Sequence, residues 1–193
     1  MKEILWHGRG GQGVVLAAQI LAEAAYLEGY GGVTSAPTFG PERRGAPVVA
    51  STRISRNPIR TVAQIEAGDV AVVLDASLFG MVDILGRLRE GGPVIVNTSS
   101  SPENLGIGGC FTLATVDATE IAVASRLIVG GMPVVNTPML GAFCRVTGLV
   151  TLDNIERALK RKMASDAAGA NFTVVQAAFE KTIVREKEKE RHG

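Results

Sequence analysis

A glycine-rich stretch near the amino terminus, GRGGQG at residues 8–13, constrains the fold of this chain more than any other feature. The short run KEIL at residues 2–5 precedes it as a candidate strand, and apolar residues from 14 to 27 follow at helical spacing. In that setting the first glycine permits a tight turn, the second lets a ligand approach the backbone, and the third allows close packing of helix on strand. Backbone N–H groups at the helix start also attract anions. We therefore expect a strand–loop–helix unit whose candidate cofactor-binding residues are Gly8, Arg9, Gly10, Gly11, Gln12 and Gly13.

As a dinucleotide site this motif is incomplete. Such a site has an acidic residue about 20 positions further on, at the end of the second strand, to hold the ribose. Here residues 31–39 contain no carboxylate, and Glu28 and Glu42 lie on either side of them. A structural turn or a different anionic ligand is therefore favoured over NAD, and a stand-alone nucleotide-binding oxidoreductase is the weaker alternative function.

Strand and helix patterns alternate along the rest of the chain. The expected strands are residues 33–38, 48–54, 70–75, 94–97 and 111–116. The expected helices are residues 64–69, 77–89, 118–128, 137–148, 151–162 and 171–189. Ser77 and Asp117 are expected to cap the second and third of these helices, and Thr151 or Asp153 is expected to start the fifth. This alternation predicts an α/β fold, a Rossmann-like doubly wound, mostly parallel sheet with helices on both faces.

The length of 193 residues suits one domain with its own core. We expect an α/β core over residues 1–150 and C-terminal helices packed on it over residues 151–193. The mixed-sign run at residues 185–193 is interpreted as a charged, solvated tail.

A charged loop, FGPERRGAP at residues 39–47, is the second candidate surface. Its prolines limit the freedom of the loop, so that Glu42, Arg43 and Arg44 are held ready to recognise a phosphate, a carboxylate or a partner chain. The alternative is a loop exposed only for solubility. In an open parallel sheet, ligands gather at the carboxyl ends of the strands. We expect the glycine loop, Asp75 and Asn97 to meet there, with Asp75 either capping the next helix or contacting the glycine loop.

A third candidate is the start of the helix near residue 137. Thr137 followed by Pro138 is typical of an N-cap with a first-turn proline, and Gly148 is the expected stop. Capping is one role for Asn136 and Thr137. The other is that their amide and hydroxyl groups face a cofactor.

No catalytic set or metal site is evident, so that no residue is assigned as catalytic or metal-binding. The two cysteines, Cys110 and Cys144, are too few for a four-iron cluster. His7 could act as an acid or base, but histidines in such positions more often hydrogen-bond a neighbouring loop. A net charge of +1 with 5% aromatic residues disfavours nucleic acid. The longest apolar run is too short to cross a membrane, and the default expectation is a cytoplasmic protein.

Three segments in matching order resemble one family: residues 8–13 with the Ala-rich helix that follows, residues 39–47, and residues 136–142. They are similar to the gamma subunit of 2-oxoacid:ferredoxin oxidoreductases, most closely the pyruvate type (pyruvate synthase). The likeness extends over about residues 2–180.

This resemblance implies a subunit of an enzyme that is inactive alone. In such complexes an oxoacid is decarboxylated on thiamine diphosphate, electrons pass through iron–sulfur clusters to ferredoxin, and the acyl group passes to coenzyme A. The resemblance implies that alpha and beta subunits hold thiamine diphosphate with Mg, that beta and delta subunits hold the clusters, and that this chain alone holds no cofactor. Its glycine loop and Glu42, Arg43 and Arg44 are then expected to face those subunits and the coenzyme A path. A purely structural assembly subunit is the alternative, and the isolated chain could form a self-dimer.

Overall fold

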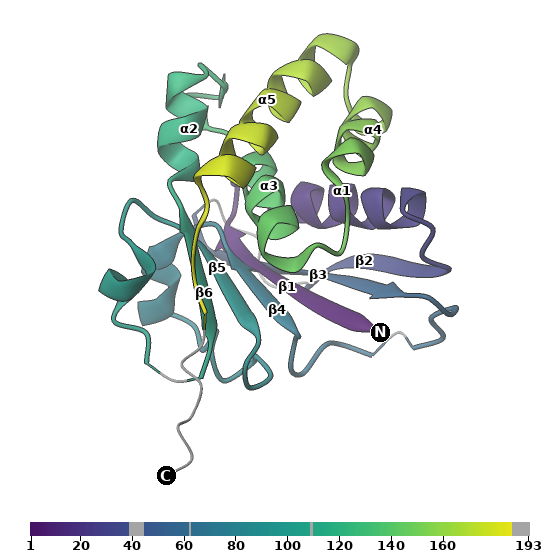
Figure 1. Ribbon diagram of the computed structural model, residues 1–193, viewed down its shortest axis with the longest axis vertical. Coiled ribbons are helices and arrows are strands. Elements are labelled where there is room, and N and C mark those ends of the chain that lie inside the picture. Colours follow the sequence, from purple (N-terminus) through teal and green to yellow (C-terminus); the bar gives the residue numbers. More distant parts are fainter. Residues whose placement is uncertain (39–44, 62, 109, 187–193) are drawn as a thin grey trace.

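The structure is a computed structural model that describes residues 1–38, 45–61, 63–108 and 110–186 (Figure 1). Its centre is a seven-stranded sheet with the strand order β2-β3-β1-β4-β5-β6-β9. The strands are β1 (Lys2–Arg9), β2 (Gly32–Thr38), β3 (Pro47–Ser55), β4 (Val70–Val73), β5 (Pro93–Asn97), β6 (Thr112–Val116) and β9 (Ile183–Arg185). A separate two-stranded hairpin is formed by β7 (Ile128–Val129) and β8 (Met132–Pro133).

Most strands of the sheet point in one direction. β1, β4, β5 and β6 are parallel neighbours, and β3 and β9 are antiparallel to theirs. Because β2 is antiparallel to β3, it regains the direction of β1. The predicted α/β fold with a mostly parallel sheet is therefore confirmed.

One face of the sheet carries all the α-helices of the described chain (Figure 1). They are α1 (Val14–Leu27), α2 (Ala118–Ala124), α3 (Asn136–Thr147), α4 (Leu152–Lys162) and α5 (Ser165–Lys181). The larger hydrophobic core lies between these helices and the sheet. At its centre Trp6 of β1 packs on Phe143 of α3, with ring centroids 6.0 Å apart. The helices α4 and α5 join this same core through residues such as Leu159 and Val174.

The prediction of α-helices on both faces is wrong for the described residues, because the opposite face is covered by shorter structure. Two 3-10 helices, η1 (Ala76–Gly80) and η2 (Pro102–Leu105), lie in the segments that cover it, and Leu78, Ile84 and Leu88 pack onto the strands in a second, smaller core. The predicted α-helix over residues 77–89 is wrong, because the Asp83 carboxylate accepts the Gly86 N–H at 2.8 Å and closes a turn inside it. Residues 64–69 also form no helix.

Several element ends differ from the expectation. α2 ends at Ala124, and α5 ends at Lys181, after which β9 returns to pair with β6. The predicted caps Asp117 and Thr151 are confirmed, since their side chains accept N–H groups of the first turn of α2 and α4. Within the described residues, no helix combines the length and apolar character that a membrane crossing requires.

Candidate functional site

The glycine loop joins β1 to α1 as predicted. Gly11 and Gly13 have φ values of 97° and 76°, in the left-handed region that favours glycine. Gly8 is required for a different reason: a Cβ there would lie 2.5 Å from the Cγ2 atom of Val14. Gly8, Gly11 and Gly13 thus serve the tight connection of strand to helix, and Gly11 and Gly13 do so in backbone conformations with φ > 0.

Two amide side chains hold the loop in shape. The Gln12 side-chain oxygen accepts the Arg9 backbone N–H at 2.7 Å, and the Gln12 N–H donates to the Arg9 carbonyl at 3.0 Å. From α3, the Asn136 Nδ2 atom donates to the Gly13 carbonyl at 3.3 Å. A Cβ on Gly13 would be 2.6 Å from that same nitrogen. The Asn136 amide therefore supports the loop from behind, at the point where α1 begins.

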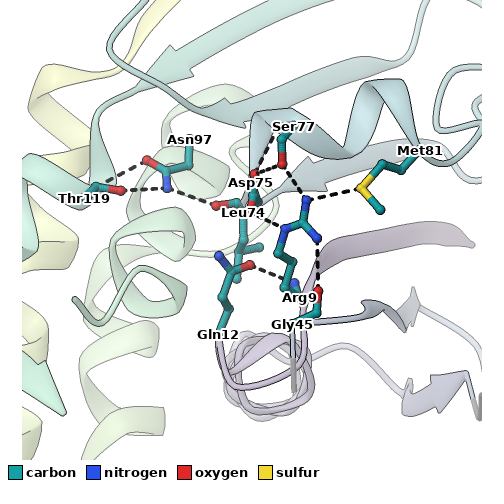
Figure 2. A network of polar contacts seen from close by, with 9 residues as sticks. All are labelled: Arg9, Gln12, Gly45, Leu74, Asp75, Ser77, Met81, Asn97 and Thr119. Atoms are coloured by element: carbon teal, nitrogen blue, oxygen red, sulfur yellow. Dashed lines mark hydrogen bonds and ion pairs between the residues drawn. The ribbon is translucent and has the colours of Figure 1, made fainter. Parts of the chain in front are cut away.

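Arg9 is at the centre of the polar network in Figure 2. Its Nε donates to Asp75 Oδ2 at 2.7 Å, its Nη1 to the Gly45 carbonyl at 3.0 Å, and its Nη2 to Ser77 Oγ at 2.7 Å, with Met81 Sδ at 3.2 Å. Asp75 also accepts the Ser77 N–H at 3.0 Å and so caps η1. Both alternatives for Asp75 therefore hold at once, and the predicted cap Ser77 is wrong.

The charge of Asp75 is stabilised in this network. Partial burial raises the pKa of its carboxyl, but the hydrogen bonds from Ser77 and Arg9 and the Arg9 charge outweigh it, so that the pKa lies below the usual range. Asp75 is therefore ionised at neutral pH and the ion pair with Arg9 is intact.

The glycine loop is also joined to the chain that precedes β3. The Gly10 N–H donates to the Ala46 carbonyl at 2.9 Å, and the Gly45 N–H donates to the Gly10 carbonyl at 3.2 Å. Glu42, Arg43 and Arg44 lie outside the described residues. The residue that follows them, Gly45, is thus bound to the glycine loop through both backbone and the Arg9 side chain.

Asn97 brings the neighbouring strand ends together. Its Nδ2 donates to the Leu74 carbonyl at 3.0 Å and to Thr119 Oγ1 at 3.1 Å (Figure 2). Its Oδ1 accepts the Ala118 N–H at 2.9 Å. These bonds tie the ends of β4 and β5 to the first turn of α2. The expectation that the glycine loop, Asp75 and Asn97 meet at the carboxyl edge is confirmed, because they line one cleft.

Two clefts flank the glycine loop, and Gly11 and Met132 line both. The first, of about 580 Å³, is the polar cleft; its polar side chains are Gln12, Asp75, Ser77, Asn97, Thr98, Ser99, Asp117 and Thr119. The second, of about 720 Å³, is the apolar cleft, lined beside Arg9 by Val14, Val15, Leu16 and Val48. The sequence interpretation missed the hairpin that carries Met132. Its signal was present, since Gly130 and Gly131, both with φ > 0, are typical of a two-residue hairpin turn.

Thr137 lies away from both clefts. Its side chain is fully buried between α3 and α5, where the hydroxyl donates to Asn171 Oδ1 at 2.7 Å. The prediction that Thr137 is an N-cap is wrong, because α3 begins at Asn136 with Val135 before it. The expected stop at Gly148 is confirmed by its left-handed conformation at the end of α3.

His7, the β1 residue that precedes the glycine loop, is buried, with 2% of its surface exposed. Neither ring nitrogen has a hydrogen-bond partner in the described part of the chain, so the expectation that it bonds a neighbouring loop is wrong. Burial, with a smaller effect of the Arg87 charge, lowers the pKa of His7 to about 4. The ring is neutral at physiological pH.

This burial predicts acid sensitivity of the fold. His7 in the unfolded chain titrates near pH 6.5, so that between about pH 6.5 and 4 the unfolded state binds more protons than the folded state. The free energy of unfolding therefore decreases as the pH is lowered through this range. We expect the His7 contribution, fully present above pH 6.5, to fall by about 2 kcal/mol by pH 5. Urea unfolding at pH 7.5 and 5 of the wild type and of His7→Leu measures it. Equal pH dependence in both proteins would contradict the assignment.

The side chains of the site are arranged to position and recognise a ligand or partner, and few of the described residues are suited to act as an activated nucleophile or a metal ligand. No group of three or more His, Cys, Asp or Glu side chains there is arranged to hold a metal ion. Both cysteines are free, and burial raises the pKa of the Cys144 thiol to about 12. A thiol of this kind is inert near neutral pH.

Comparison with known proteins identifies the family. A family model described as pyruvate ferredoxin/flavodoxin oxidoreductase matches residues 3–181. The pyruvate/ketoisovalerate oxidoreductases common subunit gamma of Thermococcus litoralis is 49% identical over 189 residues, covering 96% of this chain and 100% of that protein. The pyruvate synthase subunit PorC of Methanothermobacter marburgensis is 44% identical over 186 residues, covering 94% and 97%.

A solved structure agrees in fold as well as sequence. The pyruvate oxidoreductase subunit PORC of Thermotoga maritima superposes with a TM-score of 0.80 at 36% identity, covering 96% of this chain and 100% of that one. Matches of this identity over nearly the full length confirm the resemblance seen in the three sequence segments. The chain therefore belongs to the pyruvate ferredoxin/flavodoxin oxidoreductase family and is similar over nearly its whole length to the gamma subunits of these enzymes.

Proposed function

We propose that this chain is the gamma subunit of a 2-oxoacid:ferredoxin oxidoreductase that forms acyl-coenzyme A, with pyruvate as its oxoacid. Alpha and beta subunits would hold thiamine diphosphate with Mg, beta and delta subunits the iron–sulfur clusters, and ferredoxin would accept the electrons. The observation that carries the proposal is the 49% identity to a subunit named gamma, which this chain covers from end to end.

The site supports this assignment in physical terms. Its Arg9 and Asp75 are paired with each other, and its histidine is buried and neutral. Such a site suits a chain that presents surfaces to partners, and leaves bond making and breaking to cofactors held elsewhere in the complex.

A second oxoacid is favoured by the names of the relatives. Four relatives, at 47–49% identity, are named as a common subunit of pyruvate and ketoisovalerate oxidoreductases. The second candidate function is therefore a gamma subunit shared between a pyruvate enzyme and a branched-chain 2-oxoacid enzyme in the same cell.

Immunodepletion tests both candidates. Antibodies to this chain are added to an anaerobic extract of its native cells, with pre-immune antibodies as the matched control. Viologen dye reduction is then measured with coenzyme A and either pyruvate or 2-oxoisovalerate. Loss of pyruvate activity supports the first proposal, and loss of both activities supports a shared subunit. Full retention of both activities in the supernatant would contradict the assignment.

The charged loop is proposed to face the partner subunits and the coenzyme A path. Its motivation is three charges between prolines, next to a backbone that is bonded to the glycine loop. In the complex, Arg43→Ala with Arg44→Ala is expected to weaken assembly or raise the Michaelis constant for coenzyme A about tenfold, since charge-assisted contacts are lost. The control is Lys160→Ala with Arg161→Ala on α4. Unchanged assembly and an unchanged constant in the loop variant would overturn the idea, and a purely structural subunit would then be favoured.

A further inference from the structure

We propose that Arg9 is a positioning residue that holds the glycine loop and the Gly45–Ala46 backbone together as one rigid wall between the polar and apolar clefts, and that coenzyme A binding by the complex depends on this wall. The inference rests on the proposed function and adds a role for a side chain that does not itself contact the ligand.

The first step is that the guanidinium is already engaged. Its three nitrogens reach Asp75, the Gly45 carbonyl and Ser77, at distances from 2.7 to 3.0 Å (Figure 2). A bound phosphate would have to compete with these partners and would meet the ionised Asp75 beside them. Arg9 therefore acts through the backbone that it fixes.

The second step is that Arg9 and its partners come from three distant parts of the chain. Asp75 and Ser77 follow β4, Gly45 precedes β3, and Arg9 ends β1. One planar side chain with a fixed fork of donors thus links the glycine loop to both of its neighbours. The backbone bonds between Gly10 and residues 45–46 join the loop to the segment before β3, and the Arg9 side chain adds the link to the segment after β4.

The third step is the place of this wall. Arg9 and Gly10 line the apolar cleft, Asp75 and Ser77 line the polar cleft, and Gly11 lines both. A shift of the wall therefore changes the shape of both clefts together. Loss of precise positioning by about 1 Å is enough to alter binding or rate strongly even when the mutated residue touches no substrate.

The test uses the intact complex with Arg9→Lys. A lysine ammonium keeps the charge and can reach Asp75, but it lacks the fork that also holds Gly45 and Ser77. Asp75→Asn is the second variant: it keeps an oxygen that can cap the Ser77 N–H and removes the ion pair. Arg145→Lys is the matched control, because the Arg145 guanidinium lies over the Phe179 ring, 5.6 Å from its centroid, away from both clefts.

Three quantities are measured for each complex: the subunit composition, the Kd of coenzyme A by calorimetry, and the steady-state constants. We expect Arg9→Lys and Asp75→Asn each to raise the Kd and the Michaelis constant for coenzyme A about tenfold, with kcat within about twofold and assembly intact. The double variant should lose no more affinity for coenzyme A than the single variant with the larger loss, since both substitutions disrupt the same set of contacts. Arg145→Lys should match the wild type.

Two results would overturn the proposal. One is an unchanged affinity for coenzyme A in both variants. The other is loss of assembly, or a fall in kcat without a change in affinity, because either would make Arg9 a general structural residue. Failure of the proposed function is distinguishable, since the wild-type chain would then yield no complex with coenzyme A-dependent activity.

Discussion

Gly141→Ala is expected to cost at least about 3 kcal/mol of folding stability, the upper range for overpacking a core. Gly141 lies in α3 where this helix crosses α5. A Cβ there would overlap the carbonyl oxygen of Val175 and lie 2.9 Å from the Val175 carbonyl carbon and 3.0 Å from the Phe179 nitrogen. These are backbone atoms, so no rotamer change relieves the contact and the helices must move apart.

The matched control is Gly169→Ala in α5. No atom beyond the neighbouring residues and the local helix backbone lies within 4 Å of a Cβ placed there, and alanine has the higher helix propensity, so this variant should gain up to about 1 kcal/mol. Urea unfolding followed by the fluorescence of Trp6, the only tryptophan, reports on both, because Trp6 packs against Phe143 of α3. Equal stability of the two variants would contradict the close crossing of α3 and α5.

Glu3→Ala is expected to destabilise the fold by about 3 kcal/mol, because it leaves a buried charge without its partner. Glu3 and Arg53 are each 8% exposed. Glu3 Oε1 accepts from Arg53 Nε at 2.9 Å, and Oε2 accepts from Arg89 Nη2 at 2.6 Å. Burial raises the pKa of Glu3, but the hydrogen bonds and charges of the two arginines lower it further, so that its pKa lies below the usual value.

Glu23→Ala is the control for an exposed pair. Glu23 pairs with Arg161, whose side chain is half exposed, and removal of such a pair costs less than about 1 kcal/mol. The same urea unfolding experiment at pH 7 compares the two variants. A cost for Glu3→Ala no larger than that for Glu23→Ala would show that Arg53 finds other partners when Glu3 is absent.

The sequence pattern predicted those parts of the fold that depend on residues close to one another in the chain. The glycine loop, the alternating strand at β3 and the caps of α2 and α4 follow from residues close in sequence. The helix predicted over residues 77–89 is absent because apolar residues at helical spacing can also lie in turns and still pack on one face of the sheet. There Asp83 and Gly86 close a turn that the periodicity does not reveal.

The parts of the site that the sequence did not predict depend on contacts between residues far apart in the chain. Arg9 and Asp75 are 66 positions apart, and Thr137 and Asn171 are 34 apart, so their pairing cannot be derived from spacing. The sequence placed Arg9, Asn136 and Thr137 among candidate cofactor-binding residues. The structure gives each an internal partner: Asp75 for Arg9, the Gly13 carbonyl for Asn136, and Asn171 for Thr137. The pairing of β9 with β6 is likewise long-range, and the sequence predicted that the residues of β9 would continue the preceding helix.

The central claim is that this chain works as one subunit of a larger oxidoreductase. Affinity purification of the tagged chain from anaerobically handled native cells tests it most directly. We expect larger chains in the eluate, the brown absorbance of iron–sulfur clusters, and dye reduction that requires both pyruvate and coenzyme A. A colourless chain that elutes alone, from cells whose extract retains that activity, would contradict the account.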